Sequence, residues 1–161
     1  MPPAEHAMTN PRIDRDTRVI VQGITGRAGR LHSRLMQACG TRIVGGVSPR
    51  TDEREVNGIP LFGDCAAAVR ATGATACVSM VGAMQLLGAM REALAAGIRY
   101  LVTPTEGMPV HDALQAQRLV RDSSAIWIGA STPGMAIPGV AKLGFLPDDA
   151  LKPGALGLMS K

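Results

Sequence analysis

Three glycines at a three-residue spacing constrain this chain more than any other feature. They lie in the segment 22–29 (Gln-Gly-Ile-Thr-Gly-Arg-Ala-Gly), directly after the apolar run Val19–Val21 and before a helical pattern. Glycine adopts positive φ readily and carries no side chain, so backbone N–H groups in such a turn can approach a phosphate. The pattern predicts a strand, a phosphate-binding turn and a helix N-terminus. A tight connection without a ligand is the alternative, because a glycine fingerprint alone has low specificity.

Two arginines, Arg27 and Arg30, fall in the first turn of the predicted helix. A cation is unfavourable there, because the positive end of the helix dipole and the unpaired N–H groups lie at the same place. We interpret the two arginines as a sign that an anion binds near this turn.

Length and composition narrow the class of protein. The chain of 161 residues suits one domain with its own core and is short for two α/β domains. Its apolar stretches are interrupted well before the ~18 residues that a membrane span needs. One Trp, one Tyr and two Phe give no row of rings for stacking bases, and the net charge of +4 comes from dispersed arginines. We therefore expect a soluble protein with a small polyanionic ligand, without nucleic-acid or membrane partners.

The three cysteines indicate a reducing compartment. Cys39, Cys65 and Cys77 are an odd number at wide spacing in apolar surroundings, which fits neither a disulfide framework nor a zinc site. We expect each to be a small buried side chain in a cytoplasmic protein.

Short apolar strands alternate with helices from Thr17 onward. Together they predict a Rossmann-like α/β fold with a doubly wound parallel sheet. Right-handed crossovers then bring the C-terminal ends of all strands to one edge, where ligands bind. The loop at 51–58, a short extended segment at 59–61 and an extended pair after residue 129 complete the expected elements. Strands are predicted at 17–22, 42–47, 76–81, 100–103 and 126–128, and helices at 28–39, 64–72 (with Asp64 as N-cap), 85–96 and 109–122.

The end of the second strand bears on the kind of ligand. An NAD-binding domain needs an acid there, about 20 residues beyond the glycines, to accept the ribose hydroxyls. Residues 47–51 read Val-Ser-Pro-Arg-Thr instead, and Arg50 favours a phosphate. Both NADP, with its 2′-phosphate, and coenzyme A, with its 3′-phosphate, fit this arrangement. Glu106, just beyond the fourth strand, is placed either to bind a ligand amide or hydroxyl or to begin the next helix.

Five segments carry a family resemblance. Residues 22–29, 44–49, 71–76, 105–109 and 152–154 together resemble the N-terminal, coenzyme A-binding domain of succinyl-CoA synthetase alpha subunits, in the family's order. The resemblance implies a coenzyme A-binding domain at 17–154. Prolines and mixed charges without an apolar segment predict a flexible leader at 1–16, and the pattern at 155–161 predicts a fresh strand that starts a missing ligase domain.

The resemblance also implies site residues. Thr25 to Ala28 correspond to the family's coenzyme A-binding turn, and residues 104–106 to its second contact. The family's lysine after the second strand falls at Thr51, so Arg50 takes over its charge, and residues 80–84 replace a proline-rich segment that lines the same ligand. The expected binding residues are Gly23, Thr25, Gly26, Arg27, Ala28, Val47, Pro49, Arg50, Thr51, Val81, Pro104, Thr105 and Glu106, with no catalytic residue and no metal site.

The family's reaction joins coenzyme A to a carboxylic acid, driven by a nucleoside triphosphate through a phosphorylated histidine of the second domain. His6, His32 and His111 are therefore interpreted as structural or solvated, and the chain alone as inactive. Residues 129–134 read Gly-Ala-Ser-Thr-Pro-Gly where the family has Gly-Pro-Asn-Cys-Pro-Gly, which leaves the acid substrate open.

Two other functions stay open at the level of sequence. An NADP-dependent reductase of the dihydrodipicolinate reductase type shares the G-x-x-G-R-x-G turn, but residues 130–161 offer no catalytic His and Lys pair. A stand-alone coenzyme A-sensing subunit that pairs with another chain is the third. The expected partners of a ligase domain are coenzyme A, a beta subunit or the missing C-terminal domain, and a second copy bound through exposed apolar surface.

Overall fold

The computed structural model describes residues 12–49, 52–147, 149 and 151–159. Its centre is a seven-stranded sheet in the order β3-β4-β2-β1-β5-β6-β7. All neighbouring strands are parallel except the pair β3–β4. This confirms the predicted doubly wound parallel sheet. The strands are β1 (Val19–Gln22), β2 (Ile43–Val47), β3 (Glu55–Val56), β4 (Ile59–Phe62), β5 (Ala76–Ser79), β6 (Tyr100–Thr103) and β7 (Ile126–Gly129).

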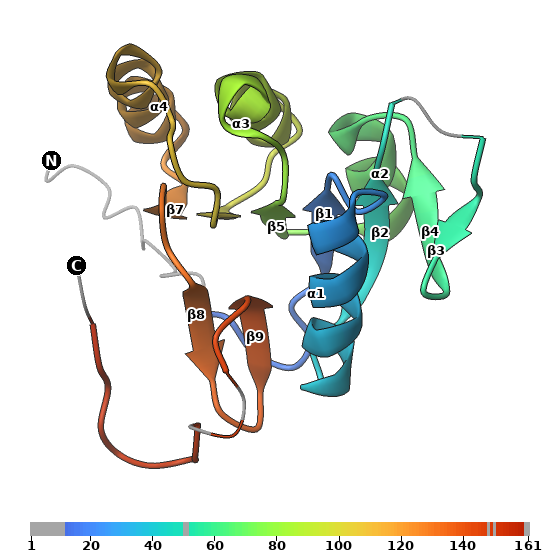
Figure 1. Cartoon of the computed structure of the whole chain (residues 1–161), viewed down its shortest axis with the longest axis vertical. Helices are drawn as coiled ribbons and strands as arrows, with labels where there is room; N and C mark the ends of the chain where they lie inside the picture. Colours follow the sequence, from blue (N-terminus) through green and yellow to red (C-terminus); the bar gives the residue numbers. More distant parts are fainter. Residues whose placement is uncertain (1–11, 50–51, 148, 150, 160–161) are drawn as a thin grey trace, which may run out of the picture.

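Helices cover both faces of the sheet (Figure 1). Three lie along one face, and one helix lies with a small hairpin on the other. Asp64 caps its helix as predicted, since its Oδ1 accepts a hydrogen bond from the N–H of Ala67 at 2.6 Å. The first face carries α2 (Cys65–Thr72), α3 (Leu86–Ala95), which follows a short 3₁₀ turn η1 (Ala83–Gln85), and α4 (Val110–Ser123); the second carries α1 (Arg27–Ala38) and the hairpin β8 (Gly134–Ile137) and β9 (Ala141–Gly144).

Two apolar clusters follow from the alternation of side chains along the central strands. Val19 and Val21 of β1 lie in the cluster on the side of α1 and the hairpin. The same cluster contains Val78 of β5 and Leu143 of β9. Ile20 faces the other way, into the cluster of α2, α3 and α4. Strands β1, β5 and β6 are buried along their whole length, as strands covered on both faces must be. The central strands, whose ends carry the predicted site, are therefore held rigidly.

The structure corrects two details of the predicted elements. The loop expected at 51–58 contains the short strand β3, because Asn57 and Gly58 both take positive φ (54° and 74°) and turn Val56 back onto Ile59. The new strand expected at 155–161 is not formed in the described residues 155–159, where Leu156 is 99% exposed and packs against nothing that would hold a strand.

The extended pair expected after residue 129 is confirmed as the hairpin β8–β9, and one buried side chain joins it to the sheet. The Oγ1 of Thr41, in the connection from α1 to β2, donates to the carbonyl of Lys142 at 2.7 Å and accepts from its N–H at 2.9 Å. Thr41 is only 4% exposed. The hairpin is thus fixed beside α1, the helix that begins at the glycine turn.

No helix in the described part of the chain combines the length and the apolar character needed to cross a membrane.

Replacement of Thr41 by Val tests this link. Val keeps the shape of the side chain but leaves the N–H and carbonyl of Lys142 without a partner in a buried place, so Thr41→Val is expected to lower the free energy of unfolding by about 1–3 kcal/mol. Urea denaturation measures the loss. Thr41→Ser keeps the hydroxyl and removes the methyl group, and it should lose less; a loss in Thr41→Ser as large as that in Thr41→Val would mean that the hydroxyl contributes no more than the methyl group.

Candidate functional site

The site forms where the chain leaves the central strand β1. From β1 the chain first builds the sheet towards β2 and β4 and then, from β5 onward, towards the opposite edge. The loops after β1 and β5 therefore diverge at the C-terminal edge of the sheet. Such a topological switch point is where doubly wound sheets bind their ligands.

Gly23 is wedged between the ends of two neighbouring strands. Its φ is +72°, and its N–H donates to the carbonyl of Val47 at the end of β2 at 3.1 Å. A Cβ at Gly23 would lie 2.7 Å from the carbonyl oxygen of Met80, just past the end of β5. Any side chain at this position would push the strand ends apart, so the residue must be glycine.

Gly29 brings the first helical turn of α1 into contact with the glycine turn that follows β1. A Cβ at Gly29 would lie 2.3 Å from the carbonyl oxygen of Gly23 and 2.6 Å from the Cα of Ile24. Gly26 is the N-cap of α1, and no side chain caps the helix. The free N–H groups at the start of α1 therefore face the switch point, which is the arrangement that binds an anion.

Short hydrogen bonds tie the neighbouring loops to this turn. The hydroxyls of Thr25 and Ser48 lie 3.1 Å apart, joining the loops after β1 and β2. Thr105 Oγ1 donates to the carbonyl of Val81 at 2.6 Å, and the carbonyl of Thr105 accepts from the N–H of Ser131 at 3.0 Å, joining the loops after β5, β6 and β7. The loops after β1 and β2 are thus joined to each other, and so are the loops after β5, β6 and β7.

The predicted site residues that the structure describes all lie at this edge. They differ in their solvent exposure. Gly26, Arg27, Ala28, Pro49 and Glu106 are exposed; Gly23, Thr25, Val81 and Thr105 are half-buried; Val47 and Pro104 are buried; Arg50 and Thr51 lie outside the described residues.

Ser48 and Ser131 are polar groups at this edge that the sequence interpretation did not assign to the site. In the sequence, Ser48 belongs to the segment 47–51 and Ser131 to the segment 129–134 that departs from the family. Their position next to Thr25 and Thr105 depends on contacts between loops, which spacing along the chain does not reveal.

Arg30 gives no independent sign of a bound anion, contrary to its interpretation in the sequence. Its guanidinium donates from Nε to the carbonyl of Thr25 at 2.9 Å and from a terminal nitrogen to the carboxylate of Glu53. Its charge is therefore already balanced. Arg27, by contrast, is exposed and forms no hydrogen bond or ion pair with any other residue that the structure describes.

A buried polar network lies beneath the turn. The amide of Gln22 donates to the carbonyl of Ala89 at 3.0 Å and to the carboxylate of Glu92 at 3.3 Å. Glu92 also accepts from the N–H of Cys65, at the start of α2, at 2.8 Å. The last residue of β1 is thereby anchored to α2 and α3, two of the three helices of that face, which holds the turn above it in place.

The two cysteines of this face, Cys65 and Cys77, are buried. A hydrogen bond with Cys65 and complete burial raise the pKa of the Cys77 thiol well above its ordinary value, which favours the protonated thiol. The expectation of small buried side chains is met by Cys65 and Cys77, whereas Cys39 is half-buried.

The two histidines that the structure describes, His32 and His111, form no hydrogen bond through their rings with another described residue. The ring of His32, on α1, packs against Phe145 with centroids 5.4 Å apart, and burial together with the nearby charge of Lys142 lowers its pKa. His111 is exposed near the start of α4, and His6 lies outside the described residues. Among the residues described, no three His, Cys, Asp or Glu side chains come together as a metal site would require.

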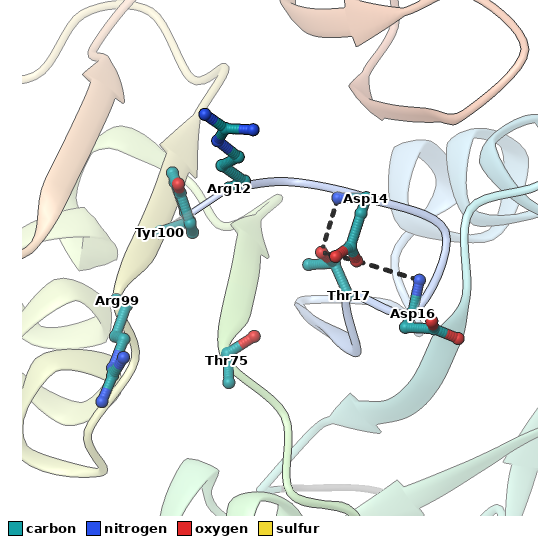
Figure 2. Close-up of a pocket in the computed structure, with 7 residues that line it drawn as sticks. All are labelled: Arg12, Asp14, Asp16, Thr17, Thr75, Arg99 and Tyr100. Atoms are coloured by element: carbon teal, nitrogen blue, oxygen red, sulfur yellow. Dashed lines mark hydrogen bonds between the residues drawn. The ribbon is translucent and has the colours of Figure 1, made fainter. Parts of the chain in front are cut away.

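A second hollow, of about 280 Å³, lies at the opposite edge of the sheet (Figure 2). Arg12 and Arg99 border it, but their guanidinium groups point away from each other, so they do not converge on one ligand. Asp14 accepts a hydrogen bond from Thr17 at 2.9 Å, which lowers the pKa of its carboxyl group. We therefore place the candidate site at the C-terminal edge. The hollow is lined by Arg12, Asp14, Asp16, Thr17, Thr75, Arg99 and Tyr100.

The fold and the uncapped glycine turn place the chain among the doubly wound, nucleotide-binding α/β domains. More closely, it belongs to the family described as CoA binding domain, whose profile matches residues 14–107. The matched segment runs from before β1 to just past β6 and includes the turn and the second predicted contact at 104–106. The expectation of a coenzyme A-binding domain is thus confirmed.

Curated relatives agree with this family. Succinate–CoA ligase (ADP-forming) subunit alpha 2 of Archaeoglobus fulgidus is 42% identical over 149 residues, which cover 92% of this chain and 52% of that protein. Malate–CoA ligase subunit alpha of Methylorubrum extorquens is 34% identical over 153 residues, with 92% and 52% covered. The resemblance to succinyl-CoA synthetase alpha subunits is therefore confirmed, and the chain spans about half the length of these curated relatives.

A solved structure shows the same fold. ATP citrate lyase from Methanothrix soehngenii, in complex with citrate and coenzyme A, superposes with a TM-score of 0.68 at 19% identity. The match covers 83% of this chain and 24% of that one. At this identity the comparison concerns the fold alone.

Two helical glycines give a matched test of the close packing at the turn. Gly29→Ala places a methyl group against backbone atoms of Gly23 and Ile24, and is expected to lower the free energy of unfolding by about 1–3 kcal/mol. Gly88→Ala, on the exposed side of α3 where a Cβ meets nothing, should raise it by about 0.5–1 kcal/mol. Urea denaturation of the two variants measures both. Equal effects would mean that the turn can relax around the methyl group.

Proposed function

We propose that this chain holds coenzyme A across the C-terminal edge of its sheet, as the coenzyme A-binding part of a nucleoside triphosphate-dependent acid–CoA ligase. The observation that carries the proposal is the uncapped start of α1 behind a turn in which Gly23 and Gly29 bring the backbone close to the switch point. This turn lies inside the segment that matches the family.

The pyrophosphate of coenzyme A would bind at the turn. The N–H groups of Arg27 and Ala28 open the helix, and the positive end of its dipole favours a phosphate there. The Arg27 side chain is exposed beside them and carries a charge with no partner in the described part of the chain. Thr25 is held by Ser48 and contributes to the wall of the site.

The second contact would be made by residues 104–106. Thr105 is fixed through Val81 and Ser131, so the loop after β6 holds a defined position beside the loop after β5. Glu106 follows it and is exposed. Its carboxylate is an acceptor for an amide or hydroxyl group of the ligand that crosses this edge.

We assign the 3′-phosphate to Arg50, with Pro49 and Thr51 beside it. The basis is the position of this segment directly after β2 and the lack of an acid at the strand end, where an NAD-binding domain has one. A guanidinium forms two parallel hydrogen bonds to a phosphate, so Arg50 would distinguish coenzyme A from ligands without that group.

The chemical role of the chain would be to bind and orient the coenzyme A. Activation of the acid by phosphoryl transfer would belong to a further domain and a beta subunit, since neither His32 nor His111 has a base or acid placed to assist it. The acid is open, as the names of the relatives include both succinate and malate. Exposed Met84, Val110 and Leu114 would serve in docking the partners or a second copy.

The test is a calorimetric titration with coenzyme A, dephospho-coenzyme A and NADPH. Coenzyme A should bind, and loss of its 3′-phosphate should weaken binding about tenfold, as expected for a hydrogen-bonded charge pair. Arg50→Ala should weaken the binding of coenzyme A by a similar factor and leave the binding of dephospho-coenzyme A unchanged. Arg54→Ala is the control, because Arg54 is an exposed arginine of the same loop.

Two results would contradict the proposal. Binding of NADPH without binding of coenzyme A would favour the reductase function. Equal effects of Arg50→Ala and Arg54→Ala on both forms of coenzyme A would mean that Arg50 contributes only general positive charge and does not bind the 3′-phosphate.

A further inference from the structure

Arg30 lies one helical turn into α1 and contacts two separate segments with its side chain. Its Nε donates to the carbonyl of Thr25, in the glycine turn, at 2.9 Å. Its terminal nitrogen donates to the carboxylate of Glu53, in the connection between β2 and β3. Both side chains of this ion pair are a little under half exposed, at 43% and 45%.

The main chain of Arg30 makes a third contact, to the tip of the hairpin β3–β4. Asn57 donates from Nδ2 to the carbonyl of Arg30 at 2.8 Å and to Ser33 Oγ at 2.9 Å. Asn57 holds this position with a positive φ of 54°. The segment that follows β2 is thus fastened to the first turns of α1 at two points, through Glu53 and through Asn57.

The contact with Thr25 fixes one peptide plane of the turn. The carbonyl of Thr25 and the N–H of Gly26 belong to the same planar, trans unit and point in opposite directions. Arg30 holds the carbonyl, and the carbonyl of Gly23 accepts from the N–H at 3.1 Å. With this plane fixed, the N–H groups of the next two residues keep their direction.

We infer that Arg30 is a positioning residue of the coenzyme A site: it sets the orientation of the phosphate-binding turn, and Glu53 acts through it. The identity of the ligand in this inference rests on the proposed function. The geometry rests on the contacts of Arg30 described above. Two of the five N–H donors of Arg30 are used by Thr25 and Glu53, and Glu53 balances its charge, so we assign its effect to the orientation of the turn.

The direction in which one substitution changes the affinity for coenzyme A distinguishes a positioning role from a simple effect of charge. Glu53→Gln removes a negative charge near the site, and charge alone would then tighten the binding of an anion such as coenzyme A. If Glu53 acts by holding Arg30 on Thr25, the same substitution releases the turn and weakens binding. The two explanations therefore predict opposite changes in affinity.

The experiment titrates the full chain and its variants with coenzyme A. Glu53→Gln should weaken binding about two- to fivefold, the size of a surface ion pair. Arg30→Ala should weaken it about tenfold through loss of two charge-assisted hydrogen bonds. The double variant should be no weaker than Arg30→Ala. Arg34→Ala, which removes the same charge one helical turn further along, should change affinity less than twofold.

Amide hydrogen exchange without ligand gives a second readout. The N–H of Gly26 should exchange faster in Arg30→Ala and Glu53→Gln than in the unaltered chain and in Arg34→Ala, while the melting temperatures stay within about 2 °C, since the pair is exposed.

Tighter binding in Glu53→Gln, or unchanged exchange at Gly26 in both variants, would overturn the inference. Absence of coenzyme A binding in the unaltered chain would instead refute the proposed function, and the exchange measurement would still decide whether Arg30 fixes the turn.

Discussion

The close approach of main chain to main chain at Gly23 is the constraint on which the rest of the site depends. The residue fits between the ends of β2 and β5 only because it has no side chain, and Gly29 lets α1 begin directly above it. The start of α1 is placed by this packing, without a capping side chain. Its N–H groups remain available for a ligand for that reason.

The surroundings of the turn reinforce it from two sides. On the face of α2 and α3, Gln22 and Glu92 bind the end of β1 to both helices in a buried setting where hydrogen bonds are costly to lose. On the face of α1, the contacts are at the surface and use Arg30, Glu53 and Asn57. The turn is thus held by a largely buried network on one side and by contacts at the surface on the other.

Much of the fold followed from local patterns in the sequence. Apolar runs between glycines gave the central strands, and the position of Asp64 gave the start of α2, because these signals act over a few residues. The glycine turn and the family resemblance predict a site at the C-terminal edge of the sheet, and the described residues of that prediction lie together there. What could not be predicted depends on residues far apart: the pairing of Arg30 with Glu53, and the contact of Ser48 with Thr25.

The predictions of a loop at 51–58 and of a strand at 155–161 were wrong for the same reason. The strand β3 is only two residues long and forms through the turn at Asn57 and Gly58, whose polar character indicated a loop. The apolar residues after Pro153 resembled a strand, but a strand needs a neighbour, and the described Leu156 and Leu158 have none. Propensity describes what a segment can do, and the partner decides whether it does so.

The position of β1 in the sheet bears on the order in which the protein folds. Val19 of β1 pairs with Ile43 of β2 and also with Ala76 of β5, much further along the chain. The nearer pairing closes a short loop, whereas the farther one must wait until the chain through β5 has been made and brought back. A nascent chain that has emerged only as far as β4 therefore contains every glycine of the turn but not β5, against whose end Gly23 packs. The turn reaches its final packing in the step that joins the two halves of the sheet.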